Sequence, residues 1–182
     1  MSSKSAQVIL PRIIRAKDAP FYLGMDNLYP AYASALRSAI AGDERITLLD
    51  ETLTDAAQSA LIASADFVLS PHRSEGFGLH LAEAMAMGKC VIATGWSGNL
   101  DFMPEGSAAL LPYTLAPLFD PTGIYQPREG DVWAEPDALA GADILQALAA
   151  DPARRAAMGA AAQDAIATRL PASSCRNALE SF

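Results

Sequence analysis

The sequence predicts an α/β fold in which a parallel sheet is flanked by helices. Short apolar runs alternate with segments of helical periodicity along most of the 182 residues. Alternation of this kind builds parallel sheets with helices on both faces. Alanine is abundant and aromatic residues make up only 7% of the chain, which favours helices packed closely on a sheet. The length fits one domain with a substantial core, expected at residues 1–170, followed by a C-terminal tail at residues 171–182.

Five apolar runs are expected to form strands, at residues 7–14, 46–49, 67–69, 91–94 and 108–111. Five segments of helical pattern are expected at residues 29–41, 55–63, 79–87, 137–149 and 152–169. In the first of these helices, apolar residues recur at the spacing of one buried face. They are Leu28, Tyr32, Ala35, Leu36, Ala39 and Ile40.

Helix boundaries are marked by local signals. Thr54 and Asp55, with Gln58 three places after Asp55, indicate a helix start, and Asp151 before Pro152 places an N-cap ahead of a proline in the first helical position. Residues 112–136 are rich in proline and glycine and follow neither period. We expect a long loop there, functional or mobile.

Composition excludes several classes of partner. The net charge of −8 argues against nucleic acid or an anionic membrane as a bulk electrostatic partner. The N-terminal apolar run is short and is broken by Pro11, so no signal peptide or membrane insertion is expected. The two cysteines, Cys90 and Cys175, indicate neither a disulfide framework nor a zinc site. A reducing cytoplasmic location is therefore expected.

The most informative motif lies between two predicted strands. Glu75 and Glu83 are eight positions apart, with the sequence Gly-Phe-Gly between them at residues 76–78. A strand, a glycine loop, a helix and a second strand form the unit that presents backbone N–H groups to a phosphate at a helix N-terminus. A carboxylate one turn into that helix repels phosphate but accepts hydrogen bonds from a vicinal diol such as ribose. The motif therefore points to a nucleotide-linked ligand.

The candidate ligand-binding residues surround this motif. Gly76, Phe77, Gly78 and Leu79 would offer main-chain N–H groups to a diphosphate and its sugar. Arg73 would neutralise phosphate charge, or is simply solvated. Ser97, Gly98 and Asn99 follow the next strand at the same sheet edge, where they would meet the sugar or form only a tight turn.

Other polar residues near the motif have simpler explanations. His72 has the chemistry of a general base, but a loop histidine is more often held by structural hydrogen bonds. His80 is expected at the rim of the site, because two histidines without a carboxylate at ligand spacing do not make a metal site. The alternative for Glu83 is an exposed helix carboxylate that binds no ligand. The alternative for Glu75 is a loop carboxylate that caps the helix that follows.

Residues 65–103 resemble the donor-binding core of retaining GT-B glycosyltransferases of the GT4 type. The match includes both glutamates, the Gly-Phe-Gly loop and Gly98 with Asn99, and it continues through residues 133–137 and 151–159. The resemblance implies a Rossmann-like domain that forms one half of a GT-B fold. It implies that Glu83 binds the donor ribose and that Glu75 contacts the transferred sugar.

The resemblance further implies transfer of a hexose, with retention, from a GDP- or UDP-linked sugar to a glycan or lipid-linked acceptor. Glu75 is the catalytic residue by position but not a nucleophile, because the leaving diphosphate helps to deprotonate the acceptor and no covalent intermediate is assumed. No metal or other cofactor is required. The pathway implied is bacterial surface polysaccharide synthesis, with a peripheral position at the inner face of the membrane left open for the full-length enzyme. Asp50 and Glu51 fall where the family reads the nucleobase.

The chain also departs from the family. We expect the N-terminal acceptor half and the first strand of the donor half to be missing, and Arg12, Arg15 and Lys17 do not reproduce the basic loop that holds the diphosphate. Donor affinity should therefore be poor, and the chain alone is expected to be inactive.

Two other function classes stay open. One is a non-catalytic interaction or dimerisation module derived from the same fold, which would form a homodimer. The other is a nicotinamide-dependent oxidoreductase, which needs a third glycine where Leu81 stands.

Overall fold

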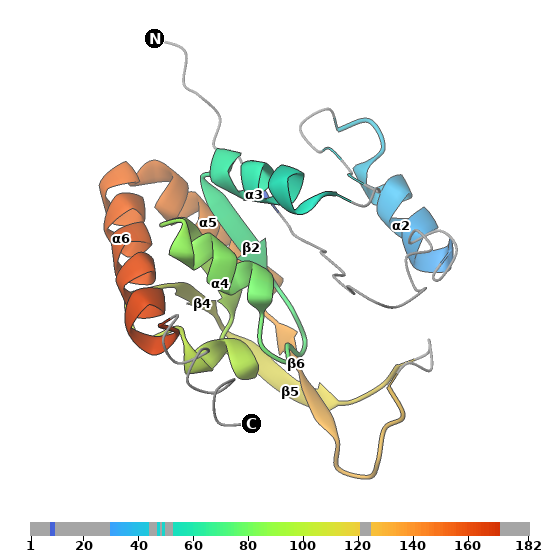
Figure 1. The fold of residues 1–182 in the computed structure, drawn as a ribbon. Coiled ribbons are helices and arrows are strands. Elements are labelled where there is room, and N and C mark those ends of the chain that lie inside the picture. The colour runs from blue at the N-terminus through green and yellow to red at the C-terminus, as the bar shows by residue number, and fades with distance from the viewer. Residues whose placement is uncertain are drawn as a thin grey trace.

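A four-stranded parallel sheet forms the centre of the molecule (Figure 1). The computed structural model describes residues 8–9, 30–43, 47, 49, 53–120 and 125–171. The strands lie in sequence order: β1 (Val8–Ile9), β2 (Phe67–Ser70), β3 (Cys90–Thr94) and β4 (Ala109–Leu111). Every neighbouring pair is parallel, so the predicted α/β class is confirmed.

The described helices follow the predicted ones closely. They are α2 (Pro30–Ile40), α3 (Asp55–Ser64), α4 (Leu79–Ala86), α5 (Ala138–Ala150) and α6 (Pro152–Arg169), with a 3-10 turn η1 (Gly98–Asp101) after β3. The Thr54 hydroxyl accepts a hydrogen bond from Ala57 N at 3.2 Å and caps α3. The Asp151 carboxylate accepts one from Arg154 N at 2.9 Å and caps α6. Both predicted helix starts are confirmed.

Helices cover both faces of the sheet, as predicted. On one face, Val68, Val91 and Ala93 share a core cluster with residues of α3, α4 and the second half of α6, and with Phe102 and Met103 just after η1. On the other face, Phe67, Cys90, Ile92 and Leu111 pack against Leu148 of α5 and Met158 of α6. This alternation along β2 and β3 follows from the two-residue period of a strand. Burial on both sides explains why β2 and β3 are continuous apolar runs.

The predicted loop at residues 112–136 is wrong at both of its ends. It contains an antiparallel hairpin made of β5 (Tyr113–Pro117) and β6 (Val132–Pro136), in which Leu115 pairs with Ala134. The hairpin extends from the lower edge of the domain in Figure 1. Prolines stand only at the strand ends, where a missing N–H is tolerated.

The predicted buried face of the first helix is also wrong for the side chains described. Ala35, Leu36 and Ala39 of α2 are exposed and Ile40 is half-buried. Periodicity identified the amphipathic helix correctly, but it carries no information about whether a packing partner is present. Of the predicted strand at residues 46–49, only Thr47 and Leu49 are described, and neither is in a strand.

Several expectations lie outside the described residues. They concern the side chain of Tyr32 and all of Leu28, Arg12, Arg15, Lys17, Asp50, Glu51, Cys175 and residues 172–182. The domain boundary at residue 170 stays a prediction.

Candidate functional site

Two loops at the carboxyl edge of the sheet carry the candidate residues. The first site loop (residues 71–78) connects β2 to α4, and the second site loop (residues 95–98) follows β3. Because β2 and β3 are parallel neighbours, their loops emerge side by side, at the edge where open α/β sheets bind ligands. The sequence therefore placed the two groups of candidates correctly next to each other.

Gly78 ends the first site loop in a conformation that favours glycine. Its φ is +85°, and a β-carbon at this position would meet Leu81 at 3.1 Å. Gly78 is the N-cap of α4, and no side chain caps the helix there. Leu81 N and Ala82 N donate to Gly78 O at 2.9 and 3.0 Å. The N–H groups of Leu79 and His80 have no partner inside the helix, so they are directed at the region in front of the loop.

The backbone of Glu75 is hydrogen-bonded to the second site loop. Glu75 N donates to Ser97 Oγ at 2.8 Å, and Gly98 N donates to Glu75 O at 2.9 Å. The Ser97 hydroxyl also donates to Glu75 O. Ser97 adopts a φ of +84°, the only positive φ of a non-glycine residue in the described ranges. Such backbone strain persists only where the surroundings hold it in place.

The Glu75 carboxylate contrasts with its fixed backbone. The side chain is half-buried, and within the described ranges it makes no hydrogen bond or ion pair. A carboxylate that is held in place without a protein partner is well suited to accept hydrogen bonds from a ligand.

Glu83 is held by a residue that the sequence did not identify as part of the site. Gln58 Nε2 of α3 donates to Glu83 Oε2 of α4 at 2.9 Å. Gln58 is only 7% exposed, and its side-chain amide is directed at Glu83. It therefore does not form a capping box with Thr54 at the start of α3. A carboxylate has about four acceptor positions, and the bond from Gln58 contributes to the orientation of Glu83. The sequence signal that could have identified Gln58 is a single glutamine within a run of small and apolar residues in α3.

His72 is part of a hydrogen-bond network that joins the two loops. Its Nε2 lies 3.1 Å from both Trp96 O and Asn99 Oδ1, and its Nδ1 lies 3.2 Å from Ser70 Oγ. Two acceptors face Nε2, so Nε2 carries the proton and Nδ1 accepts from the Ser70 hydroxyl. Both ring nitrogens are thus in use, which supports the structural interpretation of His72 over the general-base one.

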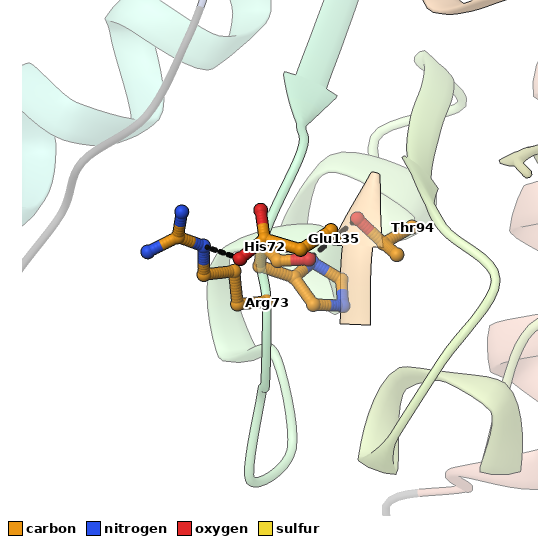
Figure 2. Close-up of polar contacts among 4 residues, drawn as sticks. All are labelled: His72, Arg73, Thr94 and Glu135. Atoms are coloured by element: carbon orange, nitrogen blue, oxygen red, sulfur yellow. Dashed lines mark hydrogen bonds and ion pairs between the residues drawn. The ribbon is translucent and has the colours of Figure 1, made fainter. Parts of the chain in front are cut away.

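Asn99 is fully buried and completes this network. Its Nδ2 donates to Thr94 O at 3.1 Å, while its Oδ1 faces His72. The Thr94 hydroxyl in turn donates to His72 O at 2.6 Å (Figure 2). The Asn99 side chain therefore connects the loops, and its contact with the sugar or its phosphate stays a prediction.

His80 lies in the first turn of α4, and its Nε2 is buried without a partner in the described ranges. Burial lowers the pKa of His80 below its ordinary value of 6.5; the charge of Glu75 opposes this, His72 adds to it, and Glu83 opposes it. The imidazole is therefore neutral at neutral pH.

Two apolar candidates of the site remain accessible. Phe77 is 42% exposed and Leu79 is 48% exposed. The Phe77 ring lies 5.1 Å from the buried ring of Phe102, which fixes one of its faces. Gly76, Phe77 and Leu79 thus lie at the surface, whereas Gly78 between them is buried.

Arg73 is directed at the β5–β6 hairpin. Its Nε lies 2.8 Å from Glu135 Oε1, and its guanidinium lies 4.6 Å from the centre of the Trp133 ring. Figure 2 shows the Arg73 and Glu135 side chains in contact, with the terminal nitrogens of Arg73 pointing away from the other residues drawn. The sequence suggested a phosphate partner or solvent, and it gave no indication of Glu135 or Trp133.

In the ranges that the structure describes, no three His, Cys, Asp or Glu side chains are grouped so that they could hold a metal ion. Over the same ranges, no helix has the length and apolar character needed to cross a membrane.

Several solved structures have a similar fold. Sucrose-phosphate synthase from Thermosynechococcus elongatus matches with a TM-score of 0.55 and 24% identity, over 82% of this chain and 34% of that one. Anabaena HepE in complex with UDP and glucose matches with a TM-score of 0.61 and 19% identity, over 86% of this chain and 38% of that one. The C-terminal domain of the glycosyl transferase group 1 family protein LpcC from Francisella tularensis matches with a TM-score of 0.54 and 20% identity, over 80% of this chain and 64% of that one.

The chain thus spans about a third of the two longer proteins and less than two thirds of the LpcC domain. The comparison with curated proteins gave no match. The family described as "Glycosyl transferases group 1" matches residues 6–124, which is more than half of the chain and includes both site loops and α4. The chain belongs to the glycosyl transferases group 1 family.

Proposed function

We propose that this chain is the donor-binding part of a retaining glycosyltransferase that uses a nucleoside-diphosphate sugar. The observation that carries the proposal is the arrangement of Glu75, the glycine loop and Glu83 around the N-terminus of α4. It combines a diphosphate-binding geometry with two oriented carboxylates, and the chain that presents it belongs to the group 1 family.

Each part of the donor has a matching group in this proposal. The N–H groups at residues 76–79 receive the diphosphate, because the N-terminal end of a helix favours negative charge. Glu83, oriented by Gln58, accepts hydrogen bonds from the ribose hydroxyls. Glu75 contacts the hydroxyls of the transferred sugar, with Ser97 and Gly98 holding its backbone. Arg73 acts through the position of its loop, because its Nε is paired with Glu135.

Glu75 stabilises the transferred sugar in this scheme and is not a nucleophile. In the retaining route the leaving diphosphate helps to deprotonate the acceptor hydroxyl. The residues around Glu75 then contribute orientation and electrostatic stabilisation. The transferred group is a hexose, the carrier is UDP or GDP, and the acceptor is a glycan or a lipid-linked glycan, as in bacterial surface polysaccharide synthesis. HepE has been crystallised with UDP-glucose, which makes UDP-glucose the first donor to test.

The test is a calorimetric titration of the chain with UDP-glucose and GDP-mannose. We expect weak, saturable binding of one donor, and at least tenfold weaker binding by Glu83→Ala, since a hydrogen bond to a charged group contributes about 1.5–3 kcal/mol. Lys89→Ala, which removes a surface side chain bonded to Ala63 O, serves as the control and should bind normally. Equal donor affinity in Glu83→Ala and the unmodified chain would contradict the ribose role.

We also propose that the 182-residue chain transfers no sugar by itself. Transfer requires donor and acceptor in near-attack geometry, and that positioning is worth about 7–11 kcal/mol of the barrier. The pure chain incubated with donors and lipid-linked or glycan acceptors should give no glycosylated product by mass spectrometry. A product that is lost in Glu75→Ala would show that the chain is a complete catalyst.

An interaction or dimerisation module remains the second candidate. The exposed side chains of Ala35, Leu36 and Ala39 on α2 favour it, because an amphipathic helix normally covers such residues. Light scattering at several concentrations tests it, and a strict monomer that binds a nucleotide sugar would rule it out.

A further inference from the structure

The β5–β6 hairpin makes a set of contacts that the proposed donor chemistry does not use. Three consecutive residues of β6 contact one residue of the first site loop. Ala134 N donates to Arg73 O at 2.9 Å, Glu135 Oε1 pairs with Arg73 Nε at 2.8 Å, and the Trp133 ring stacks on the guanidinium at 4.6 Å. Both the main chain and the side chain of Arg73 are therefore held.

Strand geometry explains how three consecutive residues of β6 can all contact Arg73. Alternate side chains of a strand point to the same face, so Trp133 and Glu135 lie side by side while Ala134 points to the opposite face. The Ala134 side chain is fully buried, which anchors this part of β6 to the body of the domain. An arginine fits such a place better than a lysine, because its planar guanidinium stacks and pairs at the same time.

The hairpin also contacts the second site loop. The ring of Tyr113, the first residue of β5, lies 5.5 Å from the ring of Trp96. Gly95 N donates to Leu111 O at 3.1 Å, which continues the loop along β4 toward the hairpin. Both loops that flank the candidate site are thus in contact with the same element.

These contacts converge on Glu75. Arg73 is fixed by the hairpin, Glu75 is fixed by Ser97 and Gly98, and only Ser74 lies between them. A segment held at both ends limits the directions that the Glu75 carboxylate can take. The Glu75 carboxylate has no hydrogen bond or ion pair in the described ranges, so its orientation depends on this backbone.

We propose that the β5–β6 hairpin is a positioning element, in which Trp133 and Glu135 hold Arg73 and so orient Glu75 toward the sugar of the donor. The inference rests on the proposed function. Trp133, Glu135 and Arg73 are positioning residues, and they act on the sugar through Glu75. Loss of the contacts between Arg73 and the hairpin should therefore remove the part of the donor affinity that the sugar contributes. The affinity for the nucleotide alone should stay unchanged.

The experiment measures sugar preference, defined as the Kd for UDP divided by the Kd for UDP-glucose, by calorimetry on the 182-residue chain. GDP and GDP-mannose are run in parallel, and the pair that the chain binds is used. Glu135→Gln and Arg73→Lys should lower the preference by roughly three- to tenfold with the Kd for UDP unchanged, given the weakness of surface ion pairs and cation–π contacts. Glu75→Gln should lower it at least as far. Glu129→Gln is the matched control, because Glu129 is exposed and precedes β6 but lies outside the contacts to Arg73.

A charge exchange provides the rescue. The double variant Arg73→Glu with Glu135→Arg should recover part of the preference that either single reversal loses, whereas a general loss of structure would not be rescued. Glu135→Gln changes a partly exposed side chain conservatively, so it remains informative if an Arg73 variant fails to fold.

The outcomes separate the two claims. Binding of neither nucleotide nor nucleotide sugar by the unmodified chain would contradict the proposed function, and this inference with it. A sugar preference that survives in Glu135→Gln and Arg73→Lys would overturn the inference alone. Equal weakening of UDP and UDP-glucose would also overturn it, because the hairpin would then act on the whole site and not on Glu75.

Discussion

Gly98 and Gly76 meet backbone to backbone at the junction of the two site loops. A β-carbon on Gly98 would lie 1.9 Å from Gly76 O and 3.1 Å from Glu75 O. A side chain at position 98 is therefore incompatible with the observed loop pairing. The absence of a side chain at this one position allows the second site loop to hold Glu75.

Gly98→Ala tests this relationship. The added methyl group must displace backbone, so we expect a loss of about 1–3 kcal/mol of stability together with loss of donor binding. Gly76→Ala is the matched control, since a β-carbon there meets nothing within 4 Å. Its effect on stability should stay within about 0.5 kcal/mol. Urea unfolding of both variants decides the matter, and equal stabilities would contradict the packing described.

The buried imidazole of His80 should make stability depend on pH. Burial lowers the pKa of His80 in the folded chain below its ordinary value of 6.5, so the unfolded chain binds more protons than the folded one in the range between the two values. Stability should therefore be unaffected by His80 above about pH 7, and should fall as the pH drops below 6.5, by at most about 1.4 kcal/mol per pH unit. The loss is complete once the pH is below the folded-state pKa.

The measurement compares chemical unfolding of the unmodified chain and His80→Gln between pH 5 and pH 8. Carboxylates titrate in both proteins, so their difference isolates His80. A constant difference across this range would show that His80 does not change its proton affinity on folding.

The Cys90 thiol should be unreactive in the folded chain. Burial raises the pKa of Cys90 to about 11, although Arg155 and Arg154 oppose the shift. At pH 8 only about one thiol in a thousand is ionised, and the thiolate is the reactive form. In a Cys175→Ser variant, iodoacetamide should modify Cys90 at the rate of unfolding, followed by mass spectrometry. Rapid modification under native conditions would contradict this burial.

Asn99→Ala should destabilise the chain by about 2–4 kcal/mol. The substitution removes a fully buried amide that donates to Thr94 O and accepts from His72. Thr94 O loses this donor, and His72 Nε2 keeps only Trp96 O as an acceptor. Asn99→Ala and His72→Gln should be strongly non-additive in a double-mutant cycle, because they remove the same hydrogen bond. Additive effects would mean that the two side chains act independently.

Local signals in the sequence were sufficient for most of the fold. The N-cap Asp151 and the following Pro152 fixed the start of α6, and both ends of this helix match the predicted residues. The strands β2 and β3 are apolar on both faces, so they were visible as continuous runs. The two glutamates and the glycine loop predict a candidate site because their spacing has a chemical meaning within one supersecondary unit, and the roles of these residues stay predictions.

What the sequence did not reveal depends on contacts between distant residues. Arg73 and Glu135 are 62 positions apart, and Gln58 and Glu83 are 25 apart, so no local pattern connects them. The hairpin was missed because its strands are short and end in proline. Each strand is also stabilised by pairing with the other, which no local pattern in the sequence shows. The exposed face of α2 shows the same limit, since amphipathicity predicts a helix but not its partner.

The central claim is that Glu83 binds the ribose of a nucleotide sugar. It is tested most directly by comparing UDP-glucose with its 2′,3′-dideoxyuridine analogue, in the unmodified chain and in Glu83→Ala, using the corresponding GDP-mannose pair if that donor binds. The account predicts that losing the ribose hydroxyls weakens binding by about 10- to 100-fold in the unmodified chain and has little effect in Glu83→Ala. An equal loss in both proteins would show that the ribose is bound by another residue, and would contradict the account.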